Sequence, residues 1–388
     1  MTHDFDVVVV GLGGLGSAAA YWLATRGGAR VLGLEQFELG HVRGESQDHS
    51  RIIRLSYHTA AYVQLAKRAY ACWAAVEADA HEPLVLKTGG LDFAPRVSAI
   101  PLEDYTRSMT FAGVPFETLD AGEIMRRWPA FRLGDDIHGV YQADSGIAMA
   151  ARGNAAHVRL AREHGATLRA HAPVERVTAQ GGEIDVTAGG RTYRAGTLIV
   201  TAGPWSNHVL GMLGSALPLT VTQEQVTYFA SAHPDEFSPD RFPVWIWMDD
   251  PCFYGCPAFG EPGPKVGQDV GGRDVTADSR TFDVDEPALE RVESFLRTHI
   301  PSMLGPRIRT KSCLYTLTPD RDFVVDALPE HPNVLVAIGA GHAFKFASVI
   351  GRILSEVALD GRTESDISAF EIDRTILTLA NPPRSYMV

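Results

Sequence analysis

The chain has 388 residues and a formal net charge of −12, with 45% hydrophobic and 21% charged residues. This composition is typical of a soluble globular protein, and the length favours two domains or one domain with large insertions. The negative charge argues against a nucleic-acid partner, and no apolar run is long enough to span a membrane. Because the first strand is predicted to start by residue 5, no signal peptide is expected, and we predict a cytoplasmic protein.

Residues 1–35 carry a dinucleotide-binding pattern. A β-branched run at 6–10 predicts a buried strand, a helix is predicted over 17–26, and a second strand over 31–34. Between and after these elements stand the residues that the pattern needs, namely Gly11, Gly13, Gly16 and Glu35. The glycines permit a tight turn, backbone approach to a pyrophosphate and close helix packing, and the glutamate can accept hydrogen bonds from a ribose. A glycine-rich turn that binds nothing is the alternative, but the flanking elements favour a nucleotide site.

The rest of the chain contains two kinds of sequence pattern. Helical periodicity is expected over 61–80, 152–165, 285–299 and 346–361, and buried strands are expected over 197–201 and near 334–338. Residues 216–315 instead hold short strands rich in β-branched and aromatic residues, which predict a mostly antiparallel sheet. We therefore predict an α/β fold with a discontinuous Rossmann-like nucleotide-binding domain over 1–85, 150–215 and 325–388. A mixed, mostly antiparallel substrate domain is predicted over 86–149 and 216–324.

The four cysteines are few and irregularly spaced. Cys252 and Cys256 have no matching second pair, so no metal site is predicted. Cys72 lies on the apolar face of the helix expected over 61–80, and we expect it in the core.

Several charged residues lie in chemically suggestive contexts. Arg51 and Arg54 would share a face if their segment were helical, either binding an anion or facing solvent. Lys265 is flanked by an apolar strand, where it could protect an edge or face a cofactor. A glycine turn that begins a helix delivers His342 and Lys345, a combination suited to an anion.

Taken together, the motifs resemble the FAD-dependent monomeric sarcosine oxidase and N-methyltryptophan oxidase group, a branch of the D-amino-acid-oxidase-like superfamily. The resemblance runs essentially from end to end and follows the family order. After GxGxxG and Glu35 come RIIR at 51–54, KTG at 87–89, RWP at 127–129, DSG at 144–146, TAGPW at 201–205, FYGCP at 253–257, KVG at 265–267, CLYT at 313–316, TPDRDFVVD at 318–326, GHAFKF at 341–346 and DISAFEIDR at 366–374.

The resemblance implies roles for individual residues. Cys313 would carry the flavin through a thioether at its 8α-methyl, and Lys265 would place a positive charge over the flavin ring where O2 is reduced. Arg54 and Lys345 would clamp the substrate carboxylate, Arg51 would lie near the flavin, and Tyr254 and Tyr315 would form aromatic walls. The implied FAD contacts are Gly11, Gly13, Gly16, Glu35, Ser50, Arg51, Val174, Gly203, Trp205, Cys313, Gly341, His342 and Lys345.

Two departures from the family pattern put the substrate in doubt. The position four residues after the lysine is Asp269 where the family often has histidine, and the turn before RIIR reads Ser46-Gln47-Asp48-His49. An acid at 269 inside the cavity would favour a cationic amine, or a substrate with an added basic or hydroxyl group. Alternatively, Asp269 is a surface residue on a loop. We count Asp269 among the candidate substrate-binding residues.

The resemblance implies a monomeric oxidase that takes a small-molecule amine and O2. The expected substrate is a secondary, N-methyl amino acid such as sarcosine. Its oxidation would give an imine that hydrolyses to formaldehyde and a primary amino acid, with O2 reduced to H2O2. Alternatives are a cyclic imino acid or an N-glycated amino acid as substrate, an O2-independent flavin amine dehydrogenase, and a non-enzymatic nucleotide-binding module.

Overall fold

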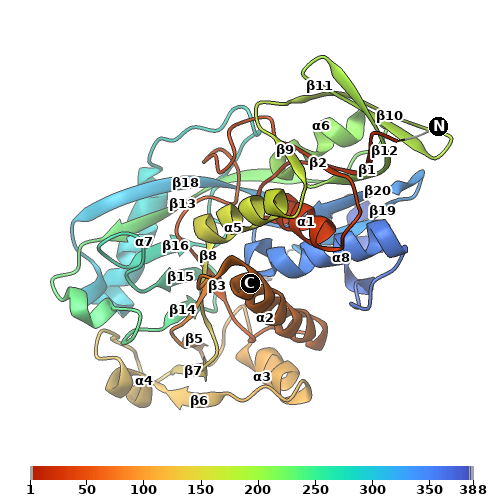
Figure 1. Ribbon diagram of the computed structural model, residues 1–388. Helices are drawn as coiled ribbons and strands as arrows, with labels where there is room; N and C mark the ends of the chain where they lie inside the picture. Colours follow the sequence, from red (N-terminus) through yellow and green to blue (C-terminus); the bar gives the residue numbers. More distant parts are fainter. Residues whose placement is uncertain (1–2, 384, 386–388) are drawn as a thin grey trace.

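The computed structural model describes residues 3–383 and 385, and its first layer is an eight-stranded sheet (Figure 1). The strand order is β10-β11-β12-β1-β2-β9, with β20 beside β12 and β19 beside β20. β1 lies between β12 and β2, and both pairings are parallel. The strands are β1 (Phe5–Val10), β2 (Val31–Leu34), β9 (Thr167–Arg169), β10 (Val174–Gln180), β11 (Glu183–Ala188), β12 (Arg191–Val200), β19 (Val324–Leu328) and β20 (His331–Ile338).

Helices cover this sheet, and α1 is central among them. It packs against α5 and α8, and α2 packs in turn on α8 (Figure 1). The α2 N-cap is Thr59, whose side chain accepts a hydrogen bond from the Tyr62 N–H, and α8 ends at Gly361 with a φ of 72°. These helices are α1 (Gly14–Thr25), α2 (Ala60–Ala80), α5 (Ala150–Glu163) and α8 (Ala347–Asp360), with the short α6 (Ser206–Gly211) nearby in sequence to β12.

The second layer is a nine-stranded sheet ordered β17-β13-β16-β15-β14-β5-β7-β6, with the long β18 beside β13. All its pairings are antiparallel except that of β14 with β5. Its strands are β5 (Gly90–Pro95), β6 (Glu117–Asp120), β7 (Ile137–Gln142), β13 (Thr220–Phe229), β14 (Val244–Trp247), β15 (Phe253–Cys256), β16 (Lys265–Gln268), β17 (Arg273–Asp274) and β18 (Arg307–Leu317). The remaining helices are α3 (Leu102–Phe111), α4 (Ala121–Arg127) and α7 (Glu286–His299).

A small three-stranded sheet contains the RIIR segment. It is ordered β3-β8-β4, formed by β3 (Ser50–Ile53), β8 (Gly146–Met149) and β4 (Val85–Lys87). The condition under which Arg51 and Arg54 would share a helical face is therefore not met, and Arg54 lies just after β3. β-branched Ile52 and Ile53 favour the extended backbone, and Arg51 pairs with Ala148 of β8 instead.

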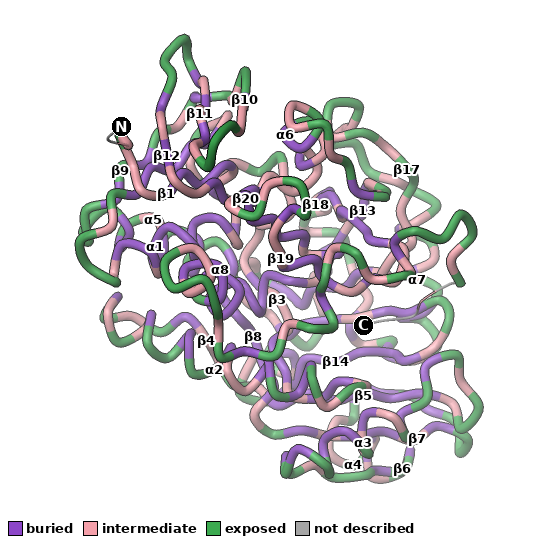
Figure 2. Tube along the Cα trace, turned by 90° about the vertical axis from the view of Figure 1, so that its right-hand side faces the viewer, coloured by how far each residue is buried: buried purple, intermediate pink, exposed green. Residues whose placement is uncertain are grey.

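The sequence-predicted boundaries follow the two large sheets closely. Every strand of the eight-stranded sheet lies within 1–85, 150–215 or 325–388, apart from Val324, the first residue of β19, and the nine-stranded sheet draws all its strands from 86–149 and 216–324. Buried strands fill both layers, whereas the β10–β11 hairpin projects with exposed edges (Figure 2). One apolar core joins the layers, since it includes Val9 of β1, Leu354 of α8 and Ile246 of β14. Whether the two parts are separate domains stays a prediction.

Candidate active site

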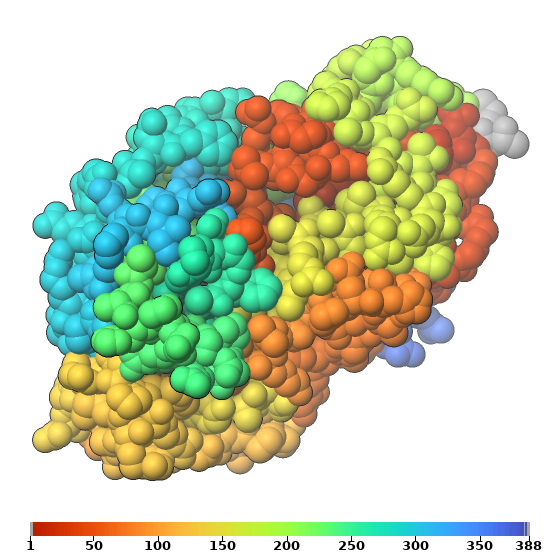
Figure 3. Space-filling view, turned by 60° about the vertical axis from the view of Figure 1, so that its left-hand side comes forward, coloured from red at the N-terminus to blue at the C-terminus, as the bar shows by residue number. Residues whose placement is uncertain are grey.

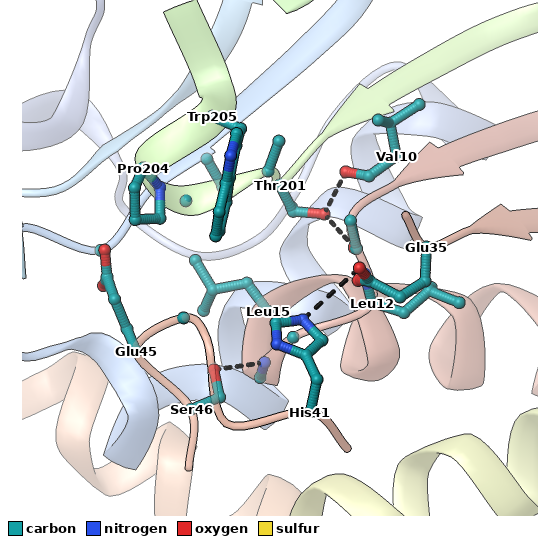
Figure 4. A pocket seen from close by; sticks show the side chains of 18 of the residues that line it. Val10, Leu12, Leu15, Glu35, His41, Glu45, Ser46, Thr201, Pro204 and Trp205 are labelled. Carbon is teal, nitrogen blue, oxygen red and sulfur yellow. Dashed lines mark hydrogen bonds and ion pairs between the residues drawn. The ribbon is translucent and has the colours of Figure 1, made fainter. Parts of the chain in front are cut away.

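A long first cavity of about 1400 Å³, counting its open mouth, begins at the carboxyl ends of β1 and β2 (Figure 4). Gly11 has a φ of 87°, and a Cβ there would lie 2.6 Å from the Thr201 carbonyl oxygen. A Cβ on Gly16 would lie 1.8 Å from the Gly11 carbonyl oxygen. Glycine at these two positions therefore lets α1 start directly beneath the cavity. Gly11 and Gly13 line the cavity, whereas Gly16 contributes by close packing.

Glu35 directly follows β2 at the rim of this cavity and is 4% exposed. Its carboxylate accepts hydrogen bonds from the Leu12 N–H at 2.9 Å and the Phe37 N–H at 3.0 Å. His41 Nε2 lies 3.4 Å away, as Figure 4 shows. Burial alone would raise the pKa of Glu35, but these hydrogen bonds outweigh it and hold the pKa below its ordinary value. The residue is a charged acceptor, as recognition of ribose hydroxyls requires.

The opposite wall of the first cavity comes from the loop after β12 and from β10. Val174 lines it, together with Gly203 and Trp205 of a short 3-10 turn, Gly203–Trp205. Figure 4 shows Trp205. The red-orange N-terminal loop borders this region and lies against the cyan segment near residue 280 (Figure 3). Arg280 stabilises that contact by donating hydrogen bonds to the carbonyl oxygens of Val42 and Arg43.

The first cavity continues into a smaller second cavity of about 810 Å³, counting its open mouth, which is lined mainly by β3 and by strands of the nine-stranded sheet. The two cavities have lining residues in common, which are Arg51, Tyr315, Gly341 and His342. These residues come from β3, β18 and the glycine turn before α8. A ligand bound along the first cavity therefore reaches the second at this junction.

Lys265, Ser50 and Cys313 all lie in the second cavity rather than the first. Lys265 is 2% exposed, and its Nζ donates to the Ser50 carbonyl oxygen at 2.6 Å and to Asp48 Oδ2 at 3.1 Å. Cys313 is buried, and burial raises the pKa of its thiol to about 12 while the nearby charge of Arg51 acts in the opposite direction. Arg51 is anchored by hydrogen bonds from its guanidinium to the carbonyl oxygens of Glu45 and Gln47, both 2.7 Å.

Two tyrosines and a lysine complete the lining. Tyr254 and Tyr315 both line the second cavity, and burial raises the pKa of each phenol well above its ordinary value. Lys345 lies in the 3-10 turn Ala343–Phe346 before α8, with its Nζ 5.5 Å from the centre of the Tyr57 ring. Burial, reinforced by the charge of Arg54, lowers the pKa of Lys345 to about 7.

Arg54 occupies a neighbouring site. It is 2% exposed and donates from Nη1 to Asp92 Oδ1 at 2.8 Å, while Ser56 donates to the other Asp92 oxygen at 2.6 Å. Arg54 is absent from the residues that line the second cavity within the described part of the chain. Its predicted contact with a substrate carboxylate therefore stays a prediction.

Asp269 faces the second cavity, and the alternative of a loop residue directed into solvent is wrong. Its side chain is 9% exposed and forms an ion pair with Arg321 Nη1 at 2.7 Å. Arg321, which also lines the cavity, follows β18 with a φ of 64°. The Arg321 carbonyl oxygen lies 2.8 Å from His342 Nε2, and this contact links the Asp269–Arg321 ion pair to the junction.

Three functional candidates went unassigned in the sequence interpretation. Asp48 and Lys311 meet beside Lys265, and Arg321 meets Asp269. Asp48 belongs to the turn before RIIR that departs from the family pattern, and Arg321 lies inside the TPDRDFVVD motif. Their pairings depend on contacts between segments more than 50 residues apart along the chain, for which a single sequence carries no signal.

The residues present fit a flavin dinucleotide. Glu35 and the α1 N-terminus face one end of the first cavity, as the adenosine and pyrophosphate parts require. At the other end, His342 Nδ1 is buried without a hydrogen-bond partner among the described residues, although the ring borders both cavities. A polar group of a ligand at the junction would supply that partner.

The fold and the cavities define a dinucleotide-binding protein, and comparison with known proteins identifies its family. The model of the family described as FAD dependent oxidoreductase matches residues 6–357, and the chain belongs to this family. This confirms the predicted fold class and FAD as the cofactor. It also shows that the protein is an enzyme, an FAD-dependent oxidoreductase.

The resemblance to the sarcosine oxidase and N-methyltryptophan oxidase group is also confirmed. The chain is 35% identical to monomeric sarcosine oxidase from Streptomyces avermitilis, covering 96% of this chain and 98% of that protein. It is 31% identical to N-methyl-L-tryptophan oxidase from Salmonella arizonae, covering 95% and 99%. Among solved structures, NikD, described as an unusual amino acid oxidase essential for nikkomycin biosynthesis, superposes with a TM-score of 0.86 at 29% identity, covering 99% and 100%.

Within the part of the chain that the structure describes, no helix has the length and apolar character needed to cross a membrane.

Proposed function

We propose that the protein oxidises a secondary amino acid, most simply an N-methyl amino acid such as sarcosine, with O2 as electron acceptor. The observation that carries the proposal is the junction, where the cofactor cavity opens into a cavity lined by Lys265, Lys345 and two tyrosines. The relatives named above as oxidases of sarcosine and N-methyl-L-tryptophan support the substrate class. Bound FAD would accept a hydride from the carbon beside the nitrogen and pass two electrons to O2, yielding H2O2.

The side chains of the second cavity have distinct proposed roles. Lys345 holds the substrate carboxylate, and the buried charge of Arg54 lies near enough to lower the pKa of Lys345. Tyr254 and Tyr315 enclose the substrate and exclude water. Holding the carboxylate at one end leaves the amine at the junction and aligns the reacting carbon. Such positioning accounts for a large part of the rate enhancement. Lys265 supplies positive charge where electrons reach O2.

The neutral amine is the reactive form, because its lone pair must be available as the hydride leaves. The phenols of Tyr254 and Tyr315 and the imidazole of His342 all have pKa values that burial shifts toward their neutral forms. None of these groups is suited to act as a strong base at the junction. Proton loss from the amine therefore precedes oxidation in this proposal, and the imine product leaves for hydrolysis in water.

The Asp269–Arg321 pair favours a second candidate, a larger N-substituted or cyclic imino acid. Both residues line the second cavity and offer a carboxylate and a guanidinium beyond the groups needed for a carboxylate and one amine. A substrate with an additional polar group would find partners there. This candidate shares the cofactor, the hydride transfer and the electron acceptor with the first.

Rates on a panel of amines would test both candidates. H2O2 formation should be measured with sarcosine, other N-methyl amino acids, proline, a six-membered cyclic imino acid and an N-glycated amino acid. Highest kcat/KM on sarcosine supports the first candidate, and preference for a ring or a glycated amine supports the second. Turnover with an artificial electron-accepting dye but not with O2 would reject the oxidase assignment.

We also propose that Cys313 binds the flavin covalently. After acid precipitation the yellow colour should remain with the protein pellet, and in a Cys313→Ala variant it should pass to the supernatant. Cys256→Ala is the matched control, because Cys256 is a buried thiol that lines the same cavity. Wild-type protein that releases its colour into the supernatant would reject the thioether while leaving FAD binding intact.

A further inference from the structure

A buried group of charges surrounds Lys265. Asp48 accepts hydrogen bonds from Lys265 Nζ at 3.1 Å, from Lys311 Nζ at 2.8 Å and from the Tyr228 hydroxyl at 2.8 Å. The exposed fractions of the Asp48, Lys265 and Lys311 side chains are 5%, 3% and 17%. Asp48 reaches this position from a backbone φ of 83°, and all three residues line the second cavity. We call Asp48, Lys265 and Lys311 the charge triad.

The contacts fix the direction of the Lys265 ammonium group. An ammonium has three N–H donors, and two of them are directed to Asp48 and to the Ser50 carbonyl oxygen. The third is left for the cavity that Lys265 lines. Asp48 and the backbone of β3 therefore orient the lysine as well as bury it.

The charge count explains why two lysines are present. Asp48 with Lys265 alone would be a neutral pair, and the positive charge beside the junction would be cancelled. Lys311 restores one net positive charge to the triad. Beyond Lys311, Glu261 lies 3.3 Å from Lys311 Nζ and 3.5 Å from both Arg309 Nε and His49 Nε2, so Lys311 shares this outer carboxylate with Arg309 and His49. Arg51 adds its charge from the other side and, with the lysines, keeps Asp48 ionised.

We propose that the charge triad, rather than Lys265 alone, sets the positive electrostatic potential on the flavin, with Asp48 and Lys311 as positioning residues that act through Lys265. The inference rests on the proposed function in one respect, since it places the reactive flavin ring at the junction. It extends that function, because the reaction of the reduced flavin with O2 would depend on all three residues of the triad. Removing Asp48 and removing Lys311 should therefore have opposite effects on anion binding.

Sulfite titration of the oxidised holoenzyme would test the inference without turnover. Sulfite is an anion that adds reversibly to oxidised flavins and bleaches their visible absorption, so its dissociation constant reports the local potential. In Asp48→Asn the triad carries two positive charges, and sulfite should bind on the order of tenfold more tightly. In Lys311→Met the triad is neutral, and binding should weaken by a similar factor. The double variant restores one net charge and should return close to wild type.

Lys87→Met is the control for charge alone, because Lys87 is 59% exposed in an ion pair with Asp144. Sulfite affinity should be unchanged in this variant. Equal affinities in Lys311→Met and Lys87→Met, or an Asp48→Asn affinity no tighter than wild type, would overturn the inference. If Asp48→Asn does not fold, the comparison of Lys311→Met with Lys87→Met still decides. The titration needs only bound flavin, so a wrong substrate assignment in the amine panel leaves its result unaffected.

Discussion

At the scale of single residues, Lys345 should make the binding of a carboxylate depend on pH. Its pKa is lowered to about 7, mainly by burial, so in the free enzyme the ammonium loses its proton as pH rises through that value. A bound carboxylate favours the charged form, so binding takes up a proton above pH 7. The affinity for a non-oxidisable carboxylate such as acetate should then fall by up to about tenfold per pH unit. Titration followed by the flavin absorption spectrum, repeated across pH, measures this.

Lys345→Arg supplies the matched variant for that experiment. Arginine stays charged throughout the range, so carboxylate affinity should no longer fall above pH 7. A wild-type affinity that is independent of pH between about 6 and 9 would contradict a carboxylate–Lys345 contact.

The same scale shows what the sequence could predict. Gly11, Gly13 and Glu35 line the first cavity as predicted. The fingerprint is local, and the strand that precedes these residues can be predicted from the amino acids of that strand alone. Asp92 was not assigned, and its pairing with Arg54 joins β5 to the residue after β3, 38 positions apart. Such a partner depends on how sheets pack, which is why it could not be read from neighbouring residues.

At the scale of elements, the contact between α1 and α8 depends on Gly351. A Cβ on Gly351 would lie 2.5 Å from the Ala18 carbonyl carbon and 2.6 Å from its Cβ, so the two helices pack backbone to backbone. Gly351→Ala should lower the free energy of unfolding by about 1–3 kcal/mol through overpacking. Denaturant unfolding followed by circular dichroism measures the change.

Gly211→Ala is the control for the loss of glycine itself. Gly211 ends α6, and a Cβ there would meet no atom within 4 Å. Its unfolding free energy should change by less than about 1 kcal/mol, with a slight gain expected from reduced freedom of the unfolded chain. If the Gly351 variant were as stable as this control, α8 would not be held against the α1 backbone.

Elements also differ in how well periodicity predicts them. The helix expected over 61–80 is α2, Ala60–Ala80, because its apolar stripe and its length are both unambiguous. The four residues of β3 are too few to show a periodicity. Arg51 in β3 and Arg54 just after it have a helical spacing, but pairing with β8 determines the extended backbone. Short segments take their structure from the strands beside them.

At the scale of the whole molecule, the two sheets share a core, and this predicts cooperative unfolding. The apolar cluster that contains Val9 and Leu354 also contains Ile246 and Met248 of the nine-stranded layer. Separate domains would lack such a common core and could unfold in separate steps. Each layer also has an apolar cluster of its own, but loss of packing in the shared cluster would expose apolar side chains of both layers. Heating should therefore give one transition.

Two probes would test this expectation. Visible flavin circular dichroism reports the junction of the two cavities, and near-ultraviolet circular dichroism includes the aromatic packing of the second layer, where Trp245 stacks on Phe295 at 5.6 Å between ring centres. The midpoints should coincide in the wild type. They should shift downward together in Gly351→Ala, because the substituted contact lies in one layer and the shared core transmits its loss to the other. Midpoints that separate, with only the flavin signal shifted, would show instead that the layers are independent domains with boundaries near 85, 150, 215 and 325.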